Sequence, residues 1–235
     1  MVIPAYNTGE SIHETVTDIA TTLSESLDWS GVAILVVDDG STDNQQTRAS
    51  AIRAGATVLS FSKNLGKGAA VRAGYREATG ELVAFLDADN SYNPEDLKLL
   101  IEKSQNCEIV IGKRQRGVRG HSSSMMRNLG SKAFHLLTHI ALKGTFLDTQ
   151  AGIKIIHIKE AREYAETGVV DRFAFDVELL AMAEVRGWRV GEVDVTPIPK
   201  DFSTVKVSLT MAMTFLSVIG IAYRKYRGFY DSPKR

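Results

Sequence analysis

The stretch Leu82–Asp89, LVAFLDAD, decides the fold expected for this chain of 235 residues. Its first five residues are all apolar, which is typical of a strand buried on both faces of a parallel sheet. The stretch then ends in two carboxylates, Asp87 and Asp89. Side chains two residues apart on an extended backbone point the same way, so these carboxylates can converge on one ligand. The pair therefore predicts a divalent-cation site at the carboxyl end of a strand. The alternative is that both residues cap the helix that Pro94 opens.

Apolar runs and helical patterns alternate around this stretch. Strands are expected at residues 2–3, 32–37, 57–61, 82–86 and 108–111, with helices at 11–27, 42–54, 67–79 and 94–104. This alternation predicts right-handed crossovers and an α/β fold with a mostly parallel sheet flanked by helices. Ligands of such sheets bind beyond the carboxyl ends of the strands. The polar clusters that follow strands in this chain are Pro4–Asn7, Asp38–Asp43, Lys63–Gly68 and Asp87–Ser91.

The second half of the chain is less regular. Helices are expected at 122–142, 175–186 and 206–226, and strands at 152–157 and 189–195. Residues 1–205 are therefore expected to form one α/β domain, and 206–235 a C-terminal amphipathic helix. Seventeen residues without a charge, 207–223, reach only the lower limit for crossing a bilayer. Because Thr210, Thr214 and Ser217 form one polar stripe, this helix is expected to lie at a membrane interface, on the core or on a second subunit.

Composition is that of an ordinary globular protein, with 44% hydrophobic and 24% charged residues and a net charge of zero. No overall field attracts nucleic acid, so no nucleic-acid partner is expected. A single cysteine, Cys107, excludes an internal disulfide and fits a reducing compartment. Met1 leads directly into a predicted strand, so no secretory signal is expected.

Two further motifs each allow a structural and a functional interpretation. VVDDGSTD, residues 36–43, forms an Asx turn before a helix, or it places the carboxylate of Asp39 against an imide N–H of a nucleobase. KNLGKGAAVRAGY, residues 63–75, is a helix start that needs small residues, or an anion site made of backbone amides and Lys67. Its spacing does not match G-x-G-x-x-G, which counts against a dinucleotide oxidoreductase.

VIPAYN, VVDDGSTD, KNLGKGAAVRAGY and FLDAD occur in this order within residues 2–91. Together they resemble the family 2 inverting glycosyltransferases, which implies the GT-A fold with its Rossmann-like sheet. DTQAGIKII (148–156) and RFAFDVELL (172–180) look like the dolichyl-phosphate (polyprenyl-phosphate) glucosyltransferase branch, with mannosyltransferases as near neighbours. The resemblance covers nearly the whole chain, most loosely after Pro199.

The resemblance implies a nucleotide-sugar site with Mg²⁺ or Mn²⁺ held by Asp87 and Asp89. It implies Asp89, Arg127 and Asp176 as catalytic residues. Asp148 and Gln150 would contact hexose hydroxyls. Thr8 and Ser91 depart from the family pattern, which often has an acidic residue at the first position and a stronger oxygen ligand at the second. The donor-binding residues implied are Pro4, Ala5, Tyr6, Asn7, Asp39, Lys67, Arg72, Asp87, Ala88, Asp89, Asp148 and Gln150.

The acceptor side allows a physical argument. A sugar hydroxyl needs a general base, whereas a phosphate monoester, with a second pKa of about 6, is already anionic and needs cations to hold it. A basic cluster between residues 113 and 132 offers them. Arg127 and Ser131 share a face of a predicted helix, and Arg114 ends the strand before it. Related lipid-phosphate enzymes have Arg and Ser at matching positions, which favours these three as the acceptor-phosphate site over a solvated surface loop.

We therefore expect metal-dependent, inverting transfer of a hexose, glucose from UDP-glucose, to polyprenyl or dolichyl phosphate. The alternatives are a GDP-mannose-dependent mannosyltransferase, a family 2 enzyme acting on a sugar hydroxyl with Asp176 or Asp148 as base, and a non-catalytic nucleotide-sugar-binding scaffold. A lipid-linked acceptor requires contact with a membrane surface, and Arg224–Arg227 favours an anionic one. The expected location is cytoplasmic, peripheral at the cytoplasmic face of a membrane. A homodimer through the last helix stays open.

Overall fold

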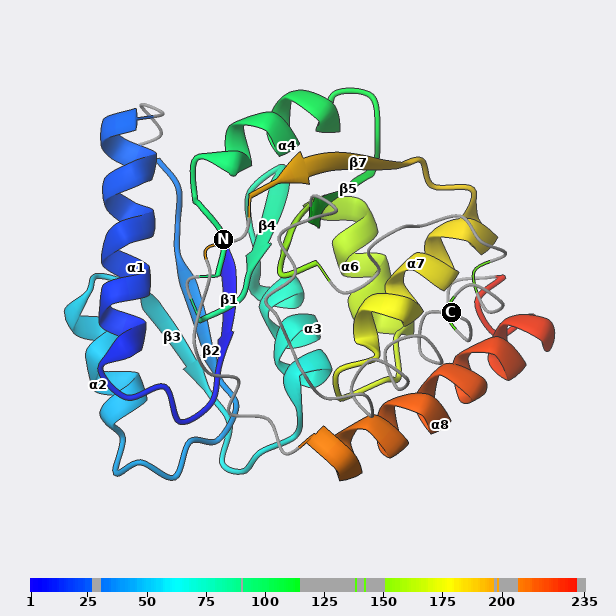
Figure 1. Ribbon diagram of the computed structural model, residues 1–235, viewed down its shortest axis with the longest axis horizontal. Coiled ribbons are helices and arrows are strands. Elements are labelled where there is room, and N and C mark those ends of the chain that lie inside the picture. The colour runs from blue at the N-terminus through cyan, green and yellow to red at the C-terminus, as the bar shows by residue number, and fades with distance from the viewer. Residues whose placement is uncertain are drawn as a thin grey trace, which may run out of the picture.

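The computed structural model describes residues 1–26, 31–89, 91–114, 138, 142, 151–196, 198 and 207–231. Within them the chain forms a seven-stranded sheet in the order β3-β2-β1-β4-β6-β5-β7 (Figure 1). The strands are β1 (Val2–Ala5), β2 (Leu35–Asp38), β3 (Thr57–Ser60), β4 (Leu82–Leu86), β5 (Ile109–Arg114), β6 (Ile153–His157) and β7 (Val190–Val195). All pairings are parallel except the two made by β6, so the mostly parallel sheet is confirmed.

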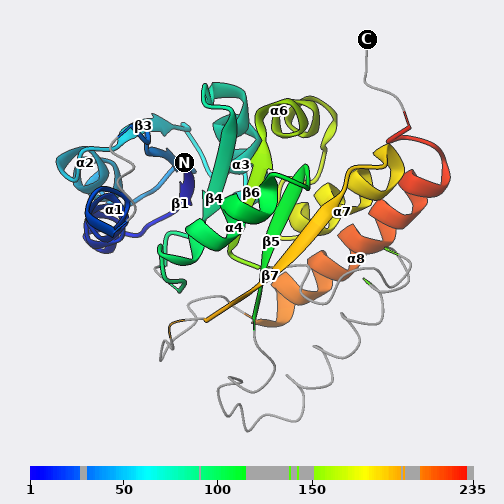
Figure 2. The ribbon, with the colours of Figure 1, turned by 90° about the horizontal axis from the view of Figure 1, so that it is seen from above.

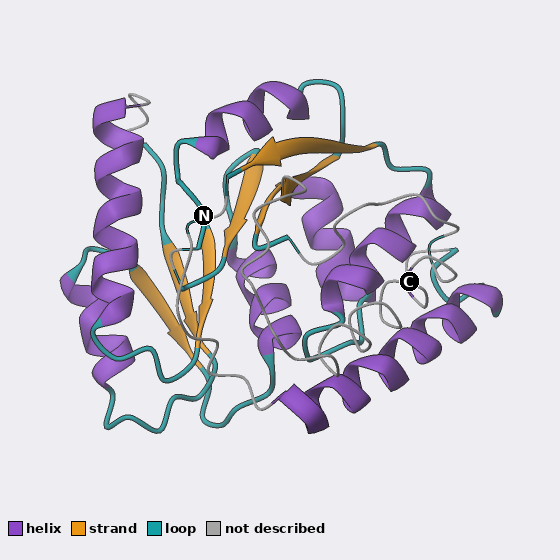
Figure 3. Cartoon of the chain, viewed as in Figure 1, coloured by secondary structure: helices purple, strands orange, loops and turns teal. Residues whose placement is uncertain are grey.

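Helices cover both faces of the sheet, as the purple helices around the orange strands show (Figure 3). One face carries α1 (Ser11–Thr21), its π-helical extension η1 (Thr22–Ser26), α2 (Gln46–Arg53) and α4 (Asp96–Ser104). The other carries α3 (Lys67–Glu77), α6 (Ile158–Thr167) and α7 (Phe175–Arg186). The last helix, α8 (Val207–Tyr226), packs on α7 and lies further from the sheet (Figure 2).

This two-sided burial explains the unbroken apolar run of β4. Val83 and Phe85 belong to the core that contains α3 and α7, whereas Leu86 belongs to the core that contains α1 and α4. Alternate side chains of a strand point to opposite faces, so a strand covered on both sides needs apolar residues throughout. The run ends at Leu86, where the chain leaves the sheet.

Strand β6 reverses the chain direction in the middle of the sheet. It pairs antiparallel with β4, with Leu86 opposite Ile153 and Phe85 opposite Lys154. The start of β6 therefore lies beside the end of β4, and the amide of Asp87 donates to the carbonyl of Gly152 at 2.9 Å. The sequence predicted this strand but not its direction.

Most predicted elements are confirmed within a few residues, and the helix predicted at 175–186 matches α7 at both ends. α2 begins at Gln46 instead of residue 42, because Asn44 and Gln45 have positive φ angles of 54° and 66° that interrupt a right-handed helix. α6 was not predicted. The helix predicted at 122–142 lies outside the described residues, apart from residues 138 and 142.

A buried carboxylate fastens the end of α8 to the domain. Glu178 of α7 is fully buried and accepts hydrogen bonds from the amides of Val169 and Val170 and from the hydroxyls of Tyr164 and Tyr230. Tyr230 follows α8, so this carboxylate joins α7, the loop before it and the C-terminal segment. None of the described helices has the length and apolarity that a bilayer crossing requires.

Replacing Tyr230 with phenylalanine should lower the free energy of unfolding by about 2 kcal/mol, because a buried carboxylate loses one hydrogen-bond donor. Urea denaturation measures the change. Tyr226→Phe is the matched control, since Tyr226 lies on the same terminal turns but is 87% exposed and should leave stability unchanged. Equal stability of the two variants would contradict the role of Glu178 as an anchor.

Candidate active site

Four loops that follow strands β1 to β4 meet at one edge of the sheet. Asn7, after β1, donates its backbone N–H to Ser41 Oγ at 2.9 Å. Its side-chain Oδ1 accepts from the backbone amide of Thr42 at 2.7 Å, so Asn7 joins the first loop to the second. Asp39 joins the second loop to the third. Lys67, at the start of α3, reaches Asp87 after β4. The predicted convergence of the polar clusters is therefore observed.

The carboxylate of Asp39 organises the loop before α3. It accepts from the amides of Leu65 and Gly66, at 2.7 and 2.9 Å, and from the side-chain amide of Asn64 at 3.0 Å. It is only 3% exposed. Burial raises the pKa of Asp39, and the two backbone amides oppose this shift. Any contact of Asp39 with a nucleobase would therefore share a carboxylate that already holds this loop in place.

Binding of phosphate by backbone amides of the same loop was one of two interpretations of its sequence. In the structure the amides of Leu65 and Gly66 donate to Asp39, and the amide of Ala69 donates to the carbonyl of Asp171 at 3.1 Å. These three donors are engaged within the protein. The ammonium group of Lys67, in the same loop, lies beside Asp87, and its side chain is partly exposed.

The remaining predicted donor residues differ in how accessible they are. Pro4 and Ala5 are buried within β1, whereas Tyr6 and Asn7 are exposed beyond its end. Arg72 is nearly buried and donates to the carbonyl of Val170 at 2.6 Å. It also forms an ion pair with Asp171. Arg72 thus holds the loop before α7 in this structure.

Close backbone packing explains the glycines of the third loop. Gly66 has a φ of 109°, and a Cβ there would collide with the carbonyl oxygen of Asp171. A Cβ at Gly68 would collide with the carbonyl oxygen of Val170 and lie 2.8 Å from Cβ of Phe175. The loop before α3 therefore lies directly against the loop before α7, which only glycine allows.

Gly66→Ala should lower the free energy of unfolding by about 2 kcal/mol, because the loop must move away from Asp171. Urea denaturation measures the effect. Gly55→Ala is the control, since Gly55 also has a positive φ, 89°, but nothing within 4 Å of the added Cβ. An equal loss of stability in Gly55→Ala would show that close packing is not the cause.

Asp87 and Asp89 occupy the end of β4 with different surroundings. Asp87 Oδ1 lies 2.5 Å from Nζ of Lys67, and both side chains are 24% exposed. Asp89 is exposed, lies in a turn, and accepts from the amide of Ser91 at 3.1 Å. The strand ends at Leu86, so extended-strand geometry does not set the direction of both carboxylates. The turn at Ala88 and Asp89 sets the direction of the second one.

A second lysine–aspartate pair is more deeply buried. Asp176 Oδ1 lies 2.7 Å from Nζ of Lys154, and the two side chains are 6% and 0% exposed. Burial raises the pKa of Asp176, although Lys154 and Lys67 oppose the shift. Burial alone would lower the pKa of Lys67, but Asp87, Asp176 and Asp89 outweigh it and raise this pKa. The two pairs therefore belong to one electrostatic cluster.

Lys154 is not among the site residues that the sequence predicted. It stands in the apolar strand IKIIH and also donates to the carbonyl of Ala151. Its neighbour Gly152 was missed too, and a Cβ there would lie 2.6 Å from Oδ2 of Asp87. A lysine within a run of buried aliphatic residues is a usable signal, because a buried ammonium group requires a partner carboxylate.

The donor chemistry of Asp87 and Asp89 suits Mg²⁺ or Mn²⁺, which prefer carboxylate oxygens. The ammonium group of Lys67 against Asp87 shows that this position accepts a cation. Among the described residues, no three His, Cys, Asp or Glu side chains gather so as to hold a metal ion. These two aspartates therefore fit a metal that takes its other ligands from the donor diphosphate and water.

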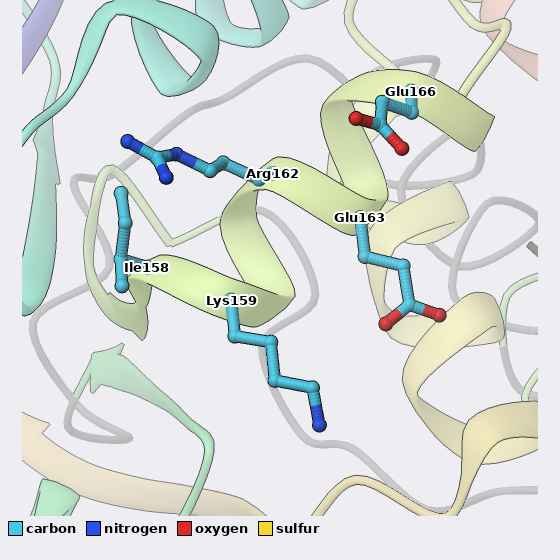
Figure 4. A pocket seen from close by; sticks show the side chains of 5 residues that line it. All are labelled: Ile158, Lys159, Arg162, Glu163 and Glu166. Carbon is cyan, nitrogen blue, oxygen red and sulfur yellow. The ribbon is translucent and has the colours of Figure 1, made fainter.

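Several predicted residues lie outside the described part of the chain: Arg127, Ser131, Asp148, Gln150 and the side chain of Arg114. A hollow on the outer face of α6 contains none of the predicted site residues (Figure 4). Residues of a single helix line it, with basic Lys159 and Arg162 and acidic Glu163 and Glu166. Glu163 is held by Arg186 at 3.1 Å. The mixed charges of this surface favour no ligand.

Residues 1–160 match the protein family described as Glycosyl transferase family 2. A dolichyl-phosphate beta-glucosyltransferase of Trichomonas vaginalis is 33% identical over 239 residues, covering 95% of this chain and 71% of the relative. A dolichyl-phosphate beta-glucosyltransferase of Saccharomyces cerevisiae is 28% identical, covering 100% and 77% of the two chains.

A solved structure agrees in fold. The crystal structure of glucosyl-3-phosphoglycerate synthase from Mycobacterium tuberculosis in complex with Mn²⁺, UDP and phosphoglyceric acid has a TM-score of 0.70. It is 18% identical, and the match covers 94% of this chain and 77% of that one. With its family match, its motifs and its GT-A fold in agreement, the chain belongs to glycosyl transferase family 2 and is a glycosyltransferase.

Proposed function

We propose that this enzyme transfers glucose from UDP-glucose to polyprenyl (dolichyl) phosphate, with inversion and with Mg²⁺ or Mn²⁺ bound. The similarity to a dolichyl-phosphate beta-glucosyltransferase over 95% of this chain carries the proposal. The complexes of glucosyl-3-phosphoglycerate synthase with UDP and with Mn²⁺ support the donor and the metal.

In the proposed reaction an oxygen of the acceptor phosphate attacks the anomeric carbon, and the bond to the UDP oxygen breaks with its electron pair leaving on UDP. Asp87 and Asp89 would hold the metal, which neutralises charge on the departing diphosphate. Lys67 lies beside Asp87 and adds a second positive charge at this edge of the sheet. Arg114, Arg127 and Ser131 remain the predicted acceptor-phosphate residues.

The burial of Asp176 favours this acceptor over a sugar hydroxyl. A hydroxyl acceptor needs a base within hydrogen-bond reach. The side chain of Asp176 is only 6% exposed and lies against Lys154, so a substrate hydroxyl has little access to it. A phosphate acceptor needs no base, because it arrives as an anion.

Contact with a membrane is proposed to occur through the exposed face of α8. Met213, Leu216, Ile219, Tyr223 and Tyr226 are exposed, and their spacing places them along one side of the helix. Exposed Arg227 follows this apolar stripe, and such a basic residue favours an anionic lipid surface. A lipid-linked acceptor stays in the bilayer, so we propose that the enzyme works at a membrane surface, at its cytoplasmic face.

Incubation of the purified protein with UDP-glucose, Mg²⁺ and a short polyprenyl phosphate tests the transfer. We expect glucosyl-phosphoryl-polyprenol in the organic phase, and none when EDTA replaces Mg²⁺. Parallel reactions contain GDP-mannose or a free sugar acceptor. A product only with GDP-mannose would identify a mannosyltransferase, and a product only with the free sugar would identify an enzyme that acts on a sugar hydroxyl. If no reaction gives a product, the remaining alternative is a non-catalytic nucleotide-sugar-binding protein.

Flotation with phosphatidylserine-containing vesicles tests the membrane contact. Leu216→Glu, which puts a charge in the middle of the exposed stripe, should abolish co-flotation. Light scattering of the same samples measures the oligomeric state. A dimer that Leu216→Glu dissociates, with no vesicle binding by either protein, would contradict the membrane contact.

A further inference from the structure

Two lysine–aspartate pairs lie together at the carboxyl end of β4. The outer pair, Lys67 and Asp87, has a separation of 2.5 Å, and each side chain is 24% exposed. The inner pair, Lys154 and Asp176, has a separation of 2.7 Å and is almost fully buried. The four charges sum to zero, and the outer pair is the one that solvent and ligands can reach.

Two aromatic rings hold the pairs in this arrangement. Nζ of Lys67 lies 5.4 Å from the ring centre of Phe85 and 5.9 Å from that of Phe175. Nζ of Lys154 lies 4.8 and 5.9 Å from the same two centres. The rings attract both ammonium groups and keep water from the inner pair. The two rings and the buried pair therefore pack against one side of the Lys67 ammonium group. The ammonium group can move only on its other side, where Asp87 lies.

We propose that Lys67 is the resident counter-ion of Asp87 and gives up this place when the divalent cation and the donor bind. The proposal rests on the proposed donor and metal. One oxygen of Asp87 cannot face an ammonium group at 2.5 Å and a metal ion on the same side. The diphosphate of the donor offers Lys67 a new anionic partner, so Lys67 would pass from Asp87 to the substrate.

A consequence of this exchange is that metal and nucleotide help each other to bind. Without nucleotide, a metal ion must displace Lys67 from Asp87. With UDP bound, Lys67 is held by the diphosphate, and Asp87 is available to the metal. Such coupling is reciprocal, so Lys67 contributes to the gain in metal affinity that UDP causes.

The buried pair is proposed to position Lys67 during the exchange. Lys67 and Lys154 lie over the same two rings, those of Phe85 and Phe175, and Lys154 contacts Asp176 at 2.7 Å. Lys154 is itself anchored to the carbonyl of Ala151 at the start of β6. The inner pair would thereby keep the ammonium of Lys67 at the site after it leaves Asp87.

Binding of Mn²⁺, followed by the loss of its free-ion EPR signal, tests the exchange without any sugar transfer. We expect wild type to bind Mn²⁺ weakly alone and much more tightly with UDP. Lys67→Met should bind Mn²⁺ alone about fivefold more tightly than wild type, because the competing ammonium is gone, and should gain less from UDP. Lys67→Gln should repeat the result with a polar side chain, and thermal unfolding confirms that both variants are folded.

Lys98→Met is the control, because it removes an exposed lysine from α4 and tests the general loss of positive charge. Three results would overturn the proposal. Lys67→Met could bind Mn²⁺ alone no more tightly than wild type, or neither protein could bind Mn²⁺. The third result is a gain in Mn²⁺ affinity in Lys98→Met equal to that in Lys67→Met. A different result would contradict the proposed function: wild type would then bind no UDP with Mn²⁺ present. The affinities of wild type and Lys67→Met for Mn²⁺ alone would still decide the role of Lys67.

Discussion

Asp87→Asn is expected to lower kcat for the proposed glucosyl transfer about a thousandfold, as removal of a group that stabilises transition-state charge does in other enzymes. The amide keeps the shape of the side chain but removes its charge. The proposed metal would then lose a ligand, and Lys67 loses the carboxylate that lies 2.5 Å from its Nζ. Initial rates with UDP-glucose and polyprenyl phosphate at saturating Mg²⁺ measure the effect.

Asp18→Asn controls for the loss of one carboxylate, since Asp18 is exposed on α1 and has no role in the proposed reaction. It should retain the wild-type rate. The result that contradicts the assignment is an Asp87→Asn enzyme that is folded, by thermal unfolding, and still transfers glucose at more than a tenth of the wild-type rate.

Asp176→Ala is expected to lower the free energy of unfolding by about 3 to 5 kcal/mol, because it leaves the ammonium group of a buried lysine without its carboxylate. Lys154 is 0% exposed and can gain little hydration where it lies. Urea denaturation followed by circular dichroism measures the change. Asp194→Ala, which removes an exposed partner of Lys113, should change stability by less than about 1 kcal/mol.

A double replacement separates stability from positioning. Lys154→Met with Asp176→Leu removes both charges and fills the space with apolar atoms, which often restores the stability lost when one partner is removed. We expect unfolding close to wild type but reduced transfer, since Lys67 loses the inner charges beside it. Full recovery of both properties would show that the pair only stabilises the fold.

Local sequence was enough to predict which strand ends and polar loops meet at one edge of the sheet. Strand β4, the carboxylates after it, and the polar loops after β1, β2 and β3 could be placed because parallel strands bring their carboxyl ends to one edge. Helix α7 was predicted at the correct residues because its apolar residues and the glycine that follows it, Gly187, are local signals. Contacts within those loops, such as that of Asn7 with Thr42, then follow from neighbouring strands.

Other features could not be predicted because they depend on residues far apart in the chain. The engagement of Asp39 with the amides of Leu65 and Gly66 takes up donors that the sequence offers to phosphate. The role of Arg72 in holding Val170 depends on a segment almost a hundred residues away, so no local pattern reveals it. In both cases an intramolecular partner competes with the ligand that the motif alone suggests.

The order and spacing of the motifs determine the family, the α/β architecture and the place of the carboxylates, since apolar periodicity and strand ends are properties of short segments. The antiparallel entry of β6 and the pairing of Lys154 with Asp176 were settled by packing in three dimensions. The physical reason is that a buried charge must find an opposite charge wherever the fold can supply one. Its partner is therefore selected by spatial proximity and not by distance along the chain.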